Sequence, residues 1–271
     1  MLKLVVMSDL HLVPEGEVSA TLDTAARLAA AVERVVERHA DADLCILAGD
    51  LADRGEAAAY ARLAPLLAPL PMPVHMMLGN HDDRPTFLAV MGPGSADPNG
   101  FVQQAVDVKG HRIVMLDTSE PGKVGGVLCA ARLGWLADRL AEARDRPVII
   151  LMHHHANPLS LPVDAIALEN PGALVSALKT HPDIRQVIAG HVHVTTTALW
   201  HGLPFTTLAG GHYSVGLKLP GWDGAQAFLE GPGQFAVVLA DEVGCTVHFE
   251  NFIDRHIPIA RANLRPRPAT A

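Results

Sequence analysis

The sequence predicts an α/β protein whose strands deliver polar side chains to one edge of a sheet. Short apolar runs, typical of strands buried on both faces, alternate with segments of helical periodicity. Five of these runs stop at an Asp, Asn or His residue. Since sites in open α/β sheets lie at the carboxyl ends of the strands, this repetition predicts a shared functional site there.

The first third of the chain alternates strands with helices. We expect strands over residues 4–7, 44–48 and 74–78, and helices over residues 21–39 and 56–67. Apolar residues in the longer helix recur every 3.6 positions, and a proline-rich segment from Pro65 to Pro73 ends the shorter one. Strands joined through helices favour parallel pairing with right-handed crossovers.

The rest of the chain is richer in strands. We expect strands over residues 101–108, 111–117, 148–152, 187–189, 204–208, 235–240 and 245–251, and helices over residues 130–143 and 173–179. The Lys109-Gly110 pair fits a hairpin turn between the first two of these strands. Because no repeat or low-complexity linker occurs, we expect one domain over residues 1–260 with a β-rich C-terminal part, followed by a frayed tail over residues 261–271.

The composition is that of a globular enzyme-sized protein. The chain has 271 residues, of which 49% are hydrophobic and 18% charged, so it can bury a substantial core. The formal net charge of -8 disfavours a long nucleic acid as partner, because such a partner requires a basic surface. A small anionic substrate held by metal ions remains compatible with this charge.

The three cysteines favour a reducing compartment. Cys45, Cys129 and Cys245 are odd in number and show no Cys-x-x-Cys spacing, which disfavours a disulfide framework. No basic n-region precedes the first strand, and no apolar run approaches the roughly 20 residues that span a bilayer. We therefore expect a cytoplasmic protein without a membrane partner.

The polar residues after the strands are ligand types of a transition-metal site. Asp50 follows a run of five apolar residues, and burying its carboxylate without a cation would be very costly. Oxygen and imidazole ligands without thiolate suit Mn, Fe, Zn or Co. The seven candidate ligands are Asp9, His11, Asp50, Asn80, His153, His191 and His193. One four-coordinate ion cannot use seven ligands, whereas two ions that share a carboxylate can, and such pairs promote in-line displacement at phosphorus.

The same motifs carry a family resemblance. Asp9-x-His11, Gly49-Asp50, Gly79-Asn80-His81-Asp82, His153 and Gly190-His191-x-His193 resemble, in type and order, the motif set of the calcineurin-like metallophosphoesterases. This resemblance implies a four-layer α/β/β/α sandwich. The segments Gly49–Asp53, Gly79–Arg84, Leu116–Ser119 and Leu133–Leu136 resemble in particular the bacterial class III cyclic nucleotide phosphodiesterases, and the related glycerophosphodiesterases share nearly all of them.

The resemblance also implies roles for these residues. Asp9, His11, Asp50 and His193 would hold the first ion, and Asn80, His153, His191 and again Asp50 the second. His81 would be the catalytic residue that stabilises the phosphoryl oxygens or protonates the leaving alkoxide. Asp82 would orient nearby imidazoles.

The expected function is that of a two-metal phosphodiesterase in which a metal-bound hydroxide attacks phosphorus. A 3′,5′-cyclic nucleotide is the first expected substrate, and the loops over residues 156–172 and 210–233 are expected to set substrate preference. A glycerophosphodiester or a phosphomonoester is the alternative substrate. A non-catalytic scaffold is disfavoured because all ligands and His81 are present. Relatives associate through the C-terminal region, so the resemblance implies a homo-oligomer.

Four further residues lie near the motifs and are not assigned as ligands. Neighbours in an extended segment point apart, so His154 is expected behind the ligands or facing substrate, and His155 is expected to have no role. Arg54 resembles the phosphate-contacting arginine of Ser/Thr phosphatases, but the third motif ends in Asp82 rather than Glu, which favours a solvated arginine. His212, in the glycine-rich stretch after Ala209-Gly210-Gly211, could approach the site but is not counted among the ligands.

Overall fold

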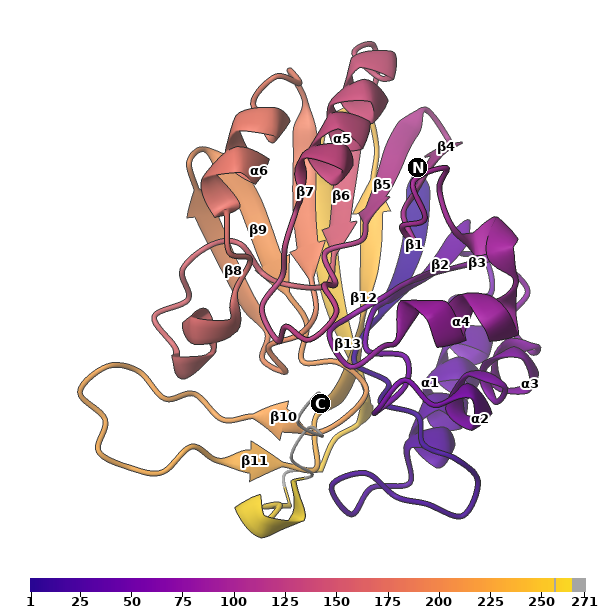
Figure 1. Cartoon of the computed structure of the whole chain (residues 1–271), viewed down its shortest axis with the longest axis vertical. Helices are drawn as coiled ribbons and strands as arrows, with labels where there is room; N and C mark the ends of the chain where they lie inside the picture. The colour runs from indigo at the N-terminus through magenta and orange to yellow at the C-terminus, as the bar shows by residue number, and fades with distance from the viewer. Residues whose placement is uncertain (256, 265–271) are drawn as a thin grey trace.

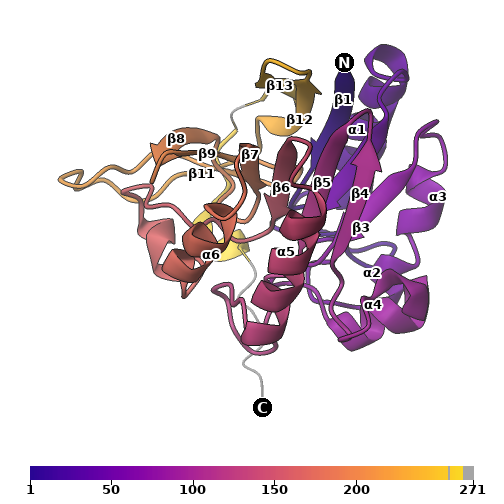
Figure 2. The ribbon, with the colours of Figure 1, turned by 90° about the horizontal axis from the view of Figure 1, so that it is seen from above.

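Two β-sheets lie face to face between two layers of helices, and the computed structural model describes residues 1–255 and 257–264. The view from above in Figure 2 shows helices α5 and α6 outside one sheet, and helices α1 to α4 outside the other. This arrangement confirms the four-layer α/β/β/α sandwich.

The first sheet has the strand order β13-β12-β1-β2-β3. Its strands are β1 (Leu2–Met7), β2 (Leu44–Ala48), β3 (Val74–Met77), β12 (Gly233–Ala240) and β13 (Cys245–Ile253). The first three pair in parallel, whereas β12 and β13 are antiparallel additions from the C-terminal part. The helices on its outer face are α1 (Thr24–Arg38), α2 (Ala57–Tyr60), α3 (Leu63–Leu67) and α4 (Arg84–Met91).

The second sheet has the strand order β4-β5-β6-β7-β9-β8. Its strands are β4 (Gln104–Val108), β5 (His111–Leu116), β6 (Val148–Met152), β7 (Ile184–Ala189), β8 (Thr196–Trp200) and β9 (Leu203–Thr207). The inner strands β5, β6, β7 and β9 run parallel, and β4 and β8 are antiparallel edges. Helices α5 (Ala130–Glu142) and α6 (Pro171–Leu178) cover its outer face.

The apolar runs are explained by a core on each side of each sheet. In β1, Leu4 and Val6 pack between the sheets, whereas Val5 and Met7 pack toward α1. Because successive strand residues point to opposite faces, apolar residues on both faces of such a strand are buried, and only Lys3 of β1 is partly exposed. Strand β6 repeats the pattern against α5 and α6, and each of its five residues is buried.

Several boundaries differ from the sequence-based expectation. Helix α1 begins at Thr24 because the Asp23 side chain caps it by accepting a hydrogen bond from the Ala26 N–H (3.0 Å). The helix predicted over residues 56–67 is two short helices, α2 and α3. The break lies at residues 61–62, where the ring of Pro65 would meet the carbonyl of Ala61 in a continuous helix.

Helix α4 and strand β8 are among the elements that were not predicted from the sequence. Helix α4 is capped by Asp83 and carries Pro85 in its first turn, a start signal that directly follows the third motif, Gly79-Asn80-His81-Asp82. Strand β8 is a partly exposed edge that pairs only with β9. Three short 3₁₀ helices, η1 (Pro93–Ser95), η2 (Pro162–Ile166) and η3 (Arg261–Asn263), lie in the connections and near the end of the described chain.

The glycine-rich stretch after β9 forms an arm. Its strands, β10 (Ser214–Val215) and β11 (Phe228–Leu229), pair as a two-stranded ribbon, and the connecting loop projects away from both sheets in Figure 1. The predicted frayed tail begins at residue 261. Arg261–Asn263 form η3 and Leu264 packs near Ile259, while residues 265–271 of that range lie outside the described residues.

All three cysteines are free thiols. Within the part of the chain that the structure describes, none of the helices is both long and apolar enough to cross a bilayer.

Candidate metal centre

The carboxyl ends of strands from both sheets meet in one place. In Figure 1 the parallel strands of both sheets run toward the same end of the molecule, next to the β10–β11 arm. Asp9 and Asp50 follow β1 and β2 of the first sheet, and His153 and His191 follow β6 and β7 of the second. The two sheets are joined there, because the Asp50 carboxylate lies 3.3 Å from His153 Nε2.

Two clusters of ligand-type atoms share one carboxylate. On one side, Asp9 Oδ1 lies 3.4 Å from His193 Nε2, and Asp50 Oδ2 lies 3.5 Å from His11 Nε2. On the other side, the same Asp50 oxygen contacts His153 Nε2, which is 3.2 Å from Asn80 Oδ1. Asp50 therefore occupies the position between the clusters that a bridging ligand requires. His191 completes the second cluster, with a ring centroid 5.1 Å from that of His153.

Each of the four imidazoles has one ring nitrogen donating a hydrogen bond away from the cluster. The pairs are His11 Nδ1 to Asp53 Oδ1 (3.2 Å), His193 Nδ1 to the Tyr213 carbonyl (2.7 Å), His153 Nδ1 to the Ala48 carbonyl (2.9 Å) and His191 Nε2 to the Ile166 carbonyl (2.9 Å). An oxygen acceptor fixes the proton on that nitrogen and leaves a lone pair on the other. This is the usual arrangement of metal-binding histidines.

The backbone at the site is held in an unusual conformation. Five of the seven candidate ligands have a positive φ: Asp9 (56°), His11 (46°), Asp50 (51°), His191 (73°) and His193 (53°). Each such residue costs on the order of 1–3 kcal/mol, and such strain clusters at functional sites. His191 and His193 therefore lie in a strained turn that follows β7, and not on the strand itself.

Glycines before the ligands allow the strand ends to approach. A Cβ on Gly79 would collide with the Asp50 carboxylate and the His153 ring. A Cβ on Gly49 would lie 2.5 Å from His153 Nδ1. The Gly-Asp and Gly-Asn pairs in the motifs are thus required by the close contact between the two sheets.

The electrostatics of the site fit bound cations. Burial alone would raise the pKa of Asp50, but the imidazoles of His153, His81 and His11 outweigh burial and hold its pKa well below the usual range. Burial also opposes protonation of His153, yet Asp50 raises its pKa to about 9. His11 Nε2 is buried without a hydrogen-bond partner among the described residues. A metal ion at this place would neutralise the buried carboxylates of Asp9 and Asp50 and would accept the lone pair of His11 Nε2.

Comparison with known proteins agrees with this geometry. A family model described as calcineurin-like phosphoesterase matches residues 2–195. The chain belongs to this family. Its members use a dimetal centre, and the shared Asp50 carboxylate and the imidazoles around it provide groups that could hold two ions.

The relatives include named phosphodiesterases. The chain is 39% identical to a probable cyclic nucleotide phosphodiesterase of Rhodopseudomonas palustris, over 80% of this chain and 81% of that protein. It is 37% identical to the 3′,5′-cyclic adenosine monophosphate phosphodiesterase CpdA of Pseudomonas aeruginosa, over 70% and 69% of the two chains. The fold is similar to that of a dimetal phosphatase from Danio rerio, with a TM-score of 0.70, 17% identity, and 95% and 98% coverage.

His81 lies at the edge of this phosphoesterase centre rather than inside it. Its backbone N–H donates to Asp50 Oδ1 (2.8 Å) and its Nδ1 donates to the Asp53 carbonyl (2.7 Å). The side chain is partly exposed, whereas the candidate ligands are buried, and it lines two cavities. It is therefore placed to meet a substrate.

The expected role of Asp82 as an acceptor for imidazoles is wrong. The hydrogen bonds to its carboxylate come from the N–H groups of Leu51 (3.1 Å), Ala52 (3.0 Å) and Gly79 (2.8 Å) and from the Tyr60 hydroxyl (3.0 Å). Asp82 thus ties the loop after β2 to the end of β3. Burial and the charge of Asp50 raise its pKa to about 6.

The residue that does orient an imidazole is Asp53, which sequence reasoning left without a role. Asp53 accepts from His11 Nδ1 and also from the Ser19 hydroxyl (2.9 Å). The signal was its position three residues after Asp50. Another buried carboxylate that sequence reasoning left without a role is that of Asp117, which accepts two hydrogen bonds, of 2.8 and 3.1 Å, from the Arg84 guanidinium.

The histidines after His153 are buried and differ in function. His154 Nε2 donates to the Val124 carbonyl (3.1 Å), and its Nδ1 bonds to the Thr118 hydroxyl (2.7 Å). Both ring nitrogens are therefore used, so His154 lies behind His153 and holds the loop after β5, although it is close enough to be grouped with the ligands. His155 is buried, and its Nε2 lies 3.5 Å from the Asp164 carboxylate.

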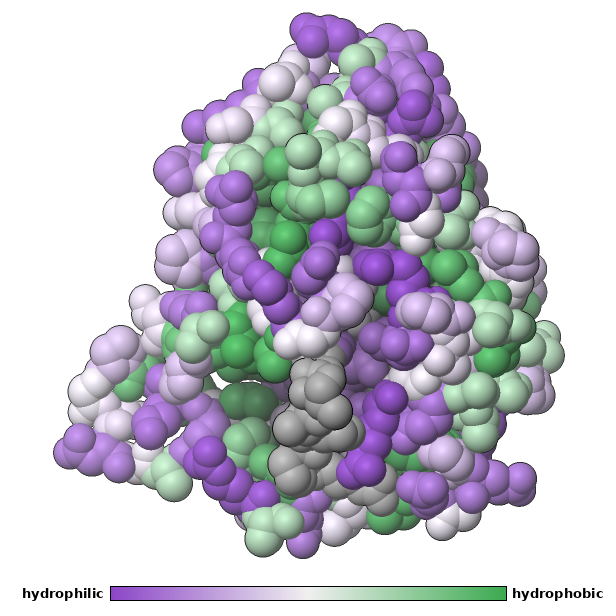
Figure 3. Space-filling model, viewed as in Figure 1, coloured by the Kyte–Doolittle hydropathy of each residue, from purple (hydrophilic) through white to green (hydrophobic). Residues whose placement is uncertain are grey.

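Two cavities adjoin the centre and meet at Asn80, His81 and Val124. One, of about 450 Å³, reaches from Asp50 and His191 to the β10–β11 arm. The other, of about 490 Å³, extends past Arg54 toward α4 and the loop at residues 119–124. Figure 3 shows hydrophilic residues gathered across the middle of the molecule, below α5 and beside α4. Arg54 is exposed there, as expected for a solvated arginine.

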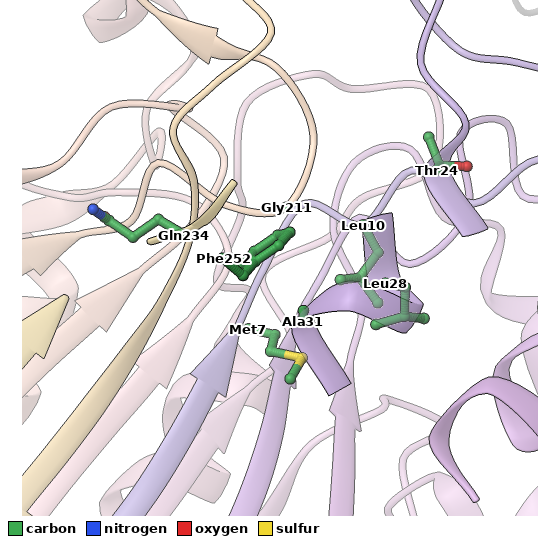
Figure 4. Close-up of a pocket in the computed structure, with 8 residues that line it drawn as sticks. All are labelled: Met7, Leu10, Thr24, Leu28, Ala31, Gly211, Gln234 and Phe252. Atoms are coloured by element: carbon green, nitrogen blue, oxygen red, sulfur yellow. The ribbon is translucent and has the colours of Figure 1, made fainter. Parts of the chain in front are cut away.

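A third cavity lies behind the loop at Gly211 and is too small for a ligand. Met7, Leu10 and Leu28 surround it in Figure 4, and its volume of about 10 Å³ admits at most roughly one water molecule. It is a packing gap between α1 and the first sheet.

Proposed function

We propose that this chain is a two-metal phosphodiesterase that hydrolyses small phosphodiesters, with 3′,5′-cyclic nucleotides as the first substrate class. The observation that carries the proposal is the pair of ligand clusters sharing Asp50, 3.5 Å from His11 Nε2 and 3.3 Å from His153 Nε2. The two relatives at 39% and 37% identity support the substrate class.

Seven side chains would hold the ions. The first ion would be held by Asp9, His11, Asp50 and His193, and the second by Asp50, Asn80, His153 and His191. When bound, two such ions supply Lewis-acid activation of water and neutralise charge on the phosphoryl oxygens. The oxygen and imidazole ligands suit Mn, Fe, Zn or Co.

His81 would transfer a proton to the leaving oxygen. Its Nδ1–H is engaged by the Asp53 carbonyl (2.7 Å), which fixes the ring and assigns proton exchange to Nε2. The position at the junction of two cavities supports this role, because the phosphorus of a substrate held at the ligands would have its ester oxygens beside His81.

The cavity toward the arm suits a nucleoside. Its volume of about 450 Å³ lies in the range of small-molecule sites. Val163, Ile166 and Phe228 supply apolar surface for a base, while Gln226 and Lys218 supply polar groups near the arm. A 3′,5′-cyclic nucleotide, whose two ester bonds lie on one sugar, would occupy this cavity alone.

The second cavity favours one further substrate class. An acyclic phosphodiester carries two separate substituents, and the two cavities that meet at His81 would take one each. Glycerophosphodiesters are therefore the second candidate. Phosphomonoesters would leave the second cavity without a ligand group.

A metal-reconstituted activity panel tests the proposal. The protein is loaded with Mn, Zn, Fe or Co and assayed on bis(p-nitrophenyl) phosphate, p-nitrophenyl phosphate, 3′,5′-cyclic AMP, 2′,3′-cyclic AMP and glycerophosphocholine. We expect metal-dependent turnover with preference for the diesters and for 3′,5′-cyclic AMP. Monoester preference would assign a phosphatase instead, and two bound ions without turnover on any substrate would indicate a non-catalytic scaffold.

We also propose that the chain forms a homo-oligomer through the β10–β11 arm. Leu217, Leu219 and Trp222, on the loop of this arm, are 51%, 47% and 65% exposed. Apolar side chains gathered on one projecting segment are typical of an association surface.

A further inference from the structure

Three imidazoles, not two, gather on the first-ion side of the centre. One nitrogen from each of His11, His193 and His212 lies within 4.8 Å of the others. The His212 ring stacks on that of His11 with centroids 4.5 Å apart and an interplanar angle of 26°, and its centroid is 6.0 Å from that of His193. All three side chains are buried.

The hydrogen bonding of His212 follows the pattern of the candidate ligands. Its Nε2 lies 3.4 Å from the Ser19 carbonyl, which can only accept, so the ring proton is assigned to Nε2. Its buried Nδ1 has no hydrogen-bond partner among the residues that the structure describes. A cation bound between His212, His11 and His193 would explain why His212 Nδ1 is buried without a hydrogen bond. Its lone pair would then bind the cation.

The backbone of His212 is fixed from two directions. The Gly211 N–H donates to the Ser8 carbonyl (2.8 Å), one residue before Asp9. The buried guanidinium of Arg27 donates to the carbonyls of Gly211 (2.7 Å) and His212 (2.7 Å). Helix α1 therefore holds the His212 loop against the loop that carries Asp9.

The approach of these loops is close. Gly210 has a φ of +79°, and a Cβ at this residue would lie 2.8 Å from the Asp9 Cβ. The gap behind Gly211 measures only about 10 Å³, so the loop is packed on its far side as well. His212 is thus held beside the first cluster rather than occupying spare space.

We propose that His212 is an additional protein ligand of the ion assigned to Asp9, His11, Asp50 and His193, bound through Nδ1. This inference rests on the proposed two-metal centre. Three imidazoles and two carboxylates form a ligand set that favours borderline transition ions such as Co, Zn and Fe over Mg or Ca.

The test uses cobalt as probe. Wild-type protein, His212→Ala and His212→Gln are loaded with two equivalents of Co²⁺, and visible absorption and bound cobalt are measured together with titrated affinity. We expect both variants to show an altered cobalt spectrum and to bind one of the two ions at least about 10-fold more weakly. Free imidazole should restore the wild-type spectrum in His212→Ala but not in His212→Gln, whose side chain fills the space.

A buried histidine elsewhere provides the matched control. His181 uses both ring nitrogens, with Nε2 donating to the Ala143 carbonyl (2.9 Å) and Nδ1 accepting from the Asp183 N–H (3.1 Å). His181→Gln should leave the cobalt spectrum unchanged. An unchanged spectrum and affinity in both His212 variants, with two ions bound, would contradict the assignment of His212 alone. Fewer than two cobalt ions in the wild-type protein would contradict the two-metal centre itself.

Discussion

At the scale of single residues, Asp50 is the side chain on which both clusters depend. Asp50→Ala removes the only carboxylate among the described residues that lies within 3.5 Å of imidazoles from both clusters. We expect bound metal to fall below two ions per chain and diester turnover to fall by more than about 100-fold. Mutating residues that only hydrogen-bond to metal ligands already lowers activity by up to about 100-fold, and loss of a ligand itself should cost more. Metal analysis and the bis(p-nitrophenyl) phosphate assay measure both quantities. Exposed Asp145→Ala is the control, and full activity in Asp50→Ala would refute the shared-ligand assignment.

Substitution of His81 should change metal content and turnover differently from substitution of Asp50, because His81 lines the substrate cavities and is not one of the buried ligands. His81→Ala should retain two ions yet lose about 10²–10⁴-fold in turnover of 3′,5′-cyclic AMP, whose alkoxide leaving group needs a proton. Turnover of bis(p-nitrophenyl) phosphate should fall far less, since p-nitrophenolate leaves unprotonated. Steady-state rates on the two substrates provide the comparison. Equal losses on both would argue against proton transfer by His81.

The residues of the centre could be predicted where they directly follow an apolar strand. Asp9, Asp50, Asn80 and His153 each follow an apolar run, and the structure places all four together. Asp53 was missed and His212 was left out of the ligand set because their contacts depend on tertiary packing. Asp53 reaches His11 across the Asp50 turn, and His212 comes from a loop 201 residues after His11 in the chain. Asp82 was misassigned because a sequence does not show that its nearest donors are backbone N–H groups.

At the scale of elements, the attachment of α1 to β13 should depend on pH. Glu250 of β13 accepts from His39 Nε2 (2.7 Å) and Arg34 (3.3 Å) at the end of α1. Burial would raise the pKa of Glu250, but these hydrogen bonds outweigh it and lower the pKa. A lowered folded-state pKa gives stability that is present above the unfolded value of about 4.3 and is lost as pH falls through the folded value.

Glu250→Gln should therefore destabilise the metal-free protein by about 0.5–1 kcal/mol at pH 7, a figure kept small because the pair is partly solvated. The difference from wild type should shrink as pH falls below about 4. Urea unfolding of both proteins at several pH values measures it. Glu242→Gln, in the exposed turn before β13, serves as control and should match wild type throughout. A difference that stays constant with pH would show that charge is not the cause.

The helices and strands could be predicted where burial of one or both faces gives the sequence a periodic apolar pattern. The inner strands and α1 and α5 were located within a few residues, since each buries a continuous face. Strand β8 was missed because an exposed edge strand needs no apolar pattern, and α4 because its start signal directly follows the third motif. The split of residues 56–67 shows a single ring, Pro65, prevailing over helical patterning.

At the scale of the whole molecule, the separation into two sheets could not be read from strand patterns alone. An apolar run is the same whether its neighbour is in its own sheet or the facing one, and only the family resemblance implied four layers. What the patterns did establish is that polar residues share the carboxyl ends. The centre exists because the ends of β1, β2 and β3 face those of β6 and β7 across the junction of the sheets.

The arm gives the remaining prediction at this scale. Leu217, Leu219 and Trp222 are exposed on a segment that projects from both sheets in Figure 1 and whose neighbours Lys218 and Gln226 line the substrate cavity. Association through the arm would shield this apolar surface and brace that wall of the cavity. We expect light scattering coupled to size exclusion to give a multiple of the 28.8 kDa chain mass for wild type. The triple substitution of the three apolar residues by serine should give the monomer mass.

Val243 offers a matched control for the arm, because it is an apolar residue with 91% exposure on the turn between β12 and β13. Val243→Ser should leave the mass of the assembly unchanged, since a single exposed apolar side chain is ordinary on a protein surface. If association braces the cavity, the triple variant should also raise KM for 3′,5′-cyclic AMP while the two ions stay bound. A monomeric wild-type protein would refute the oligomer, and an oligomer that survives the triple substitution would place the contact elsewhere.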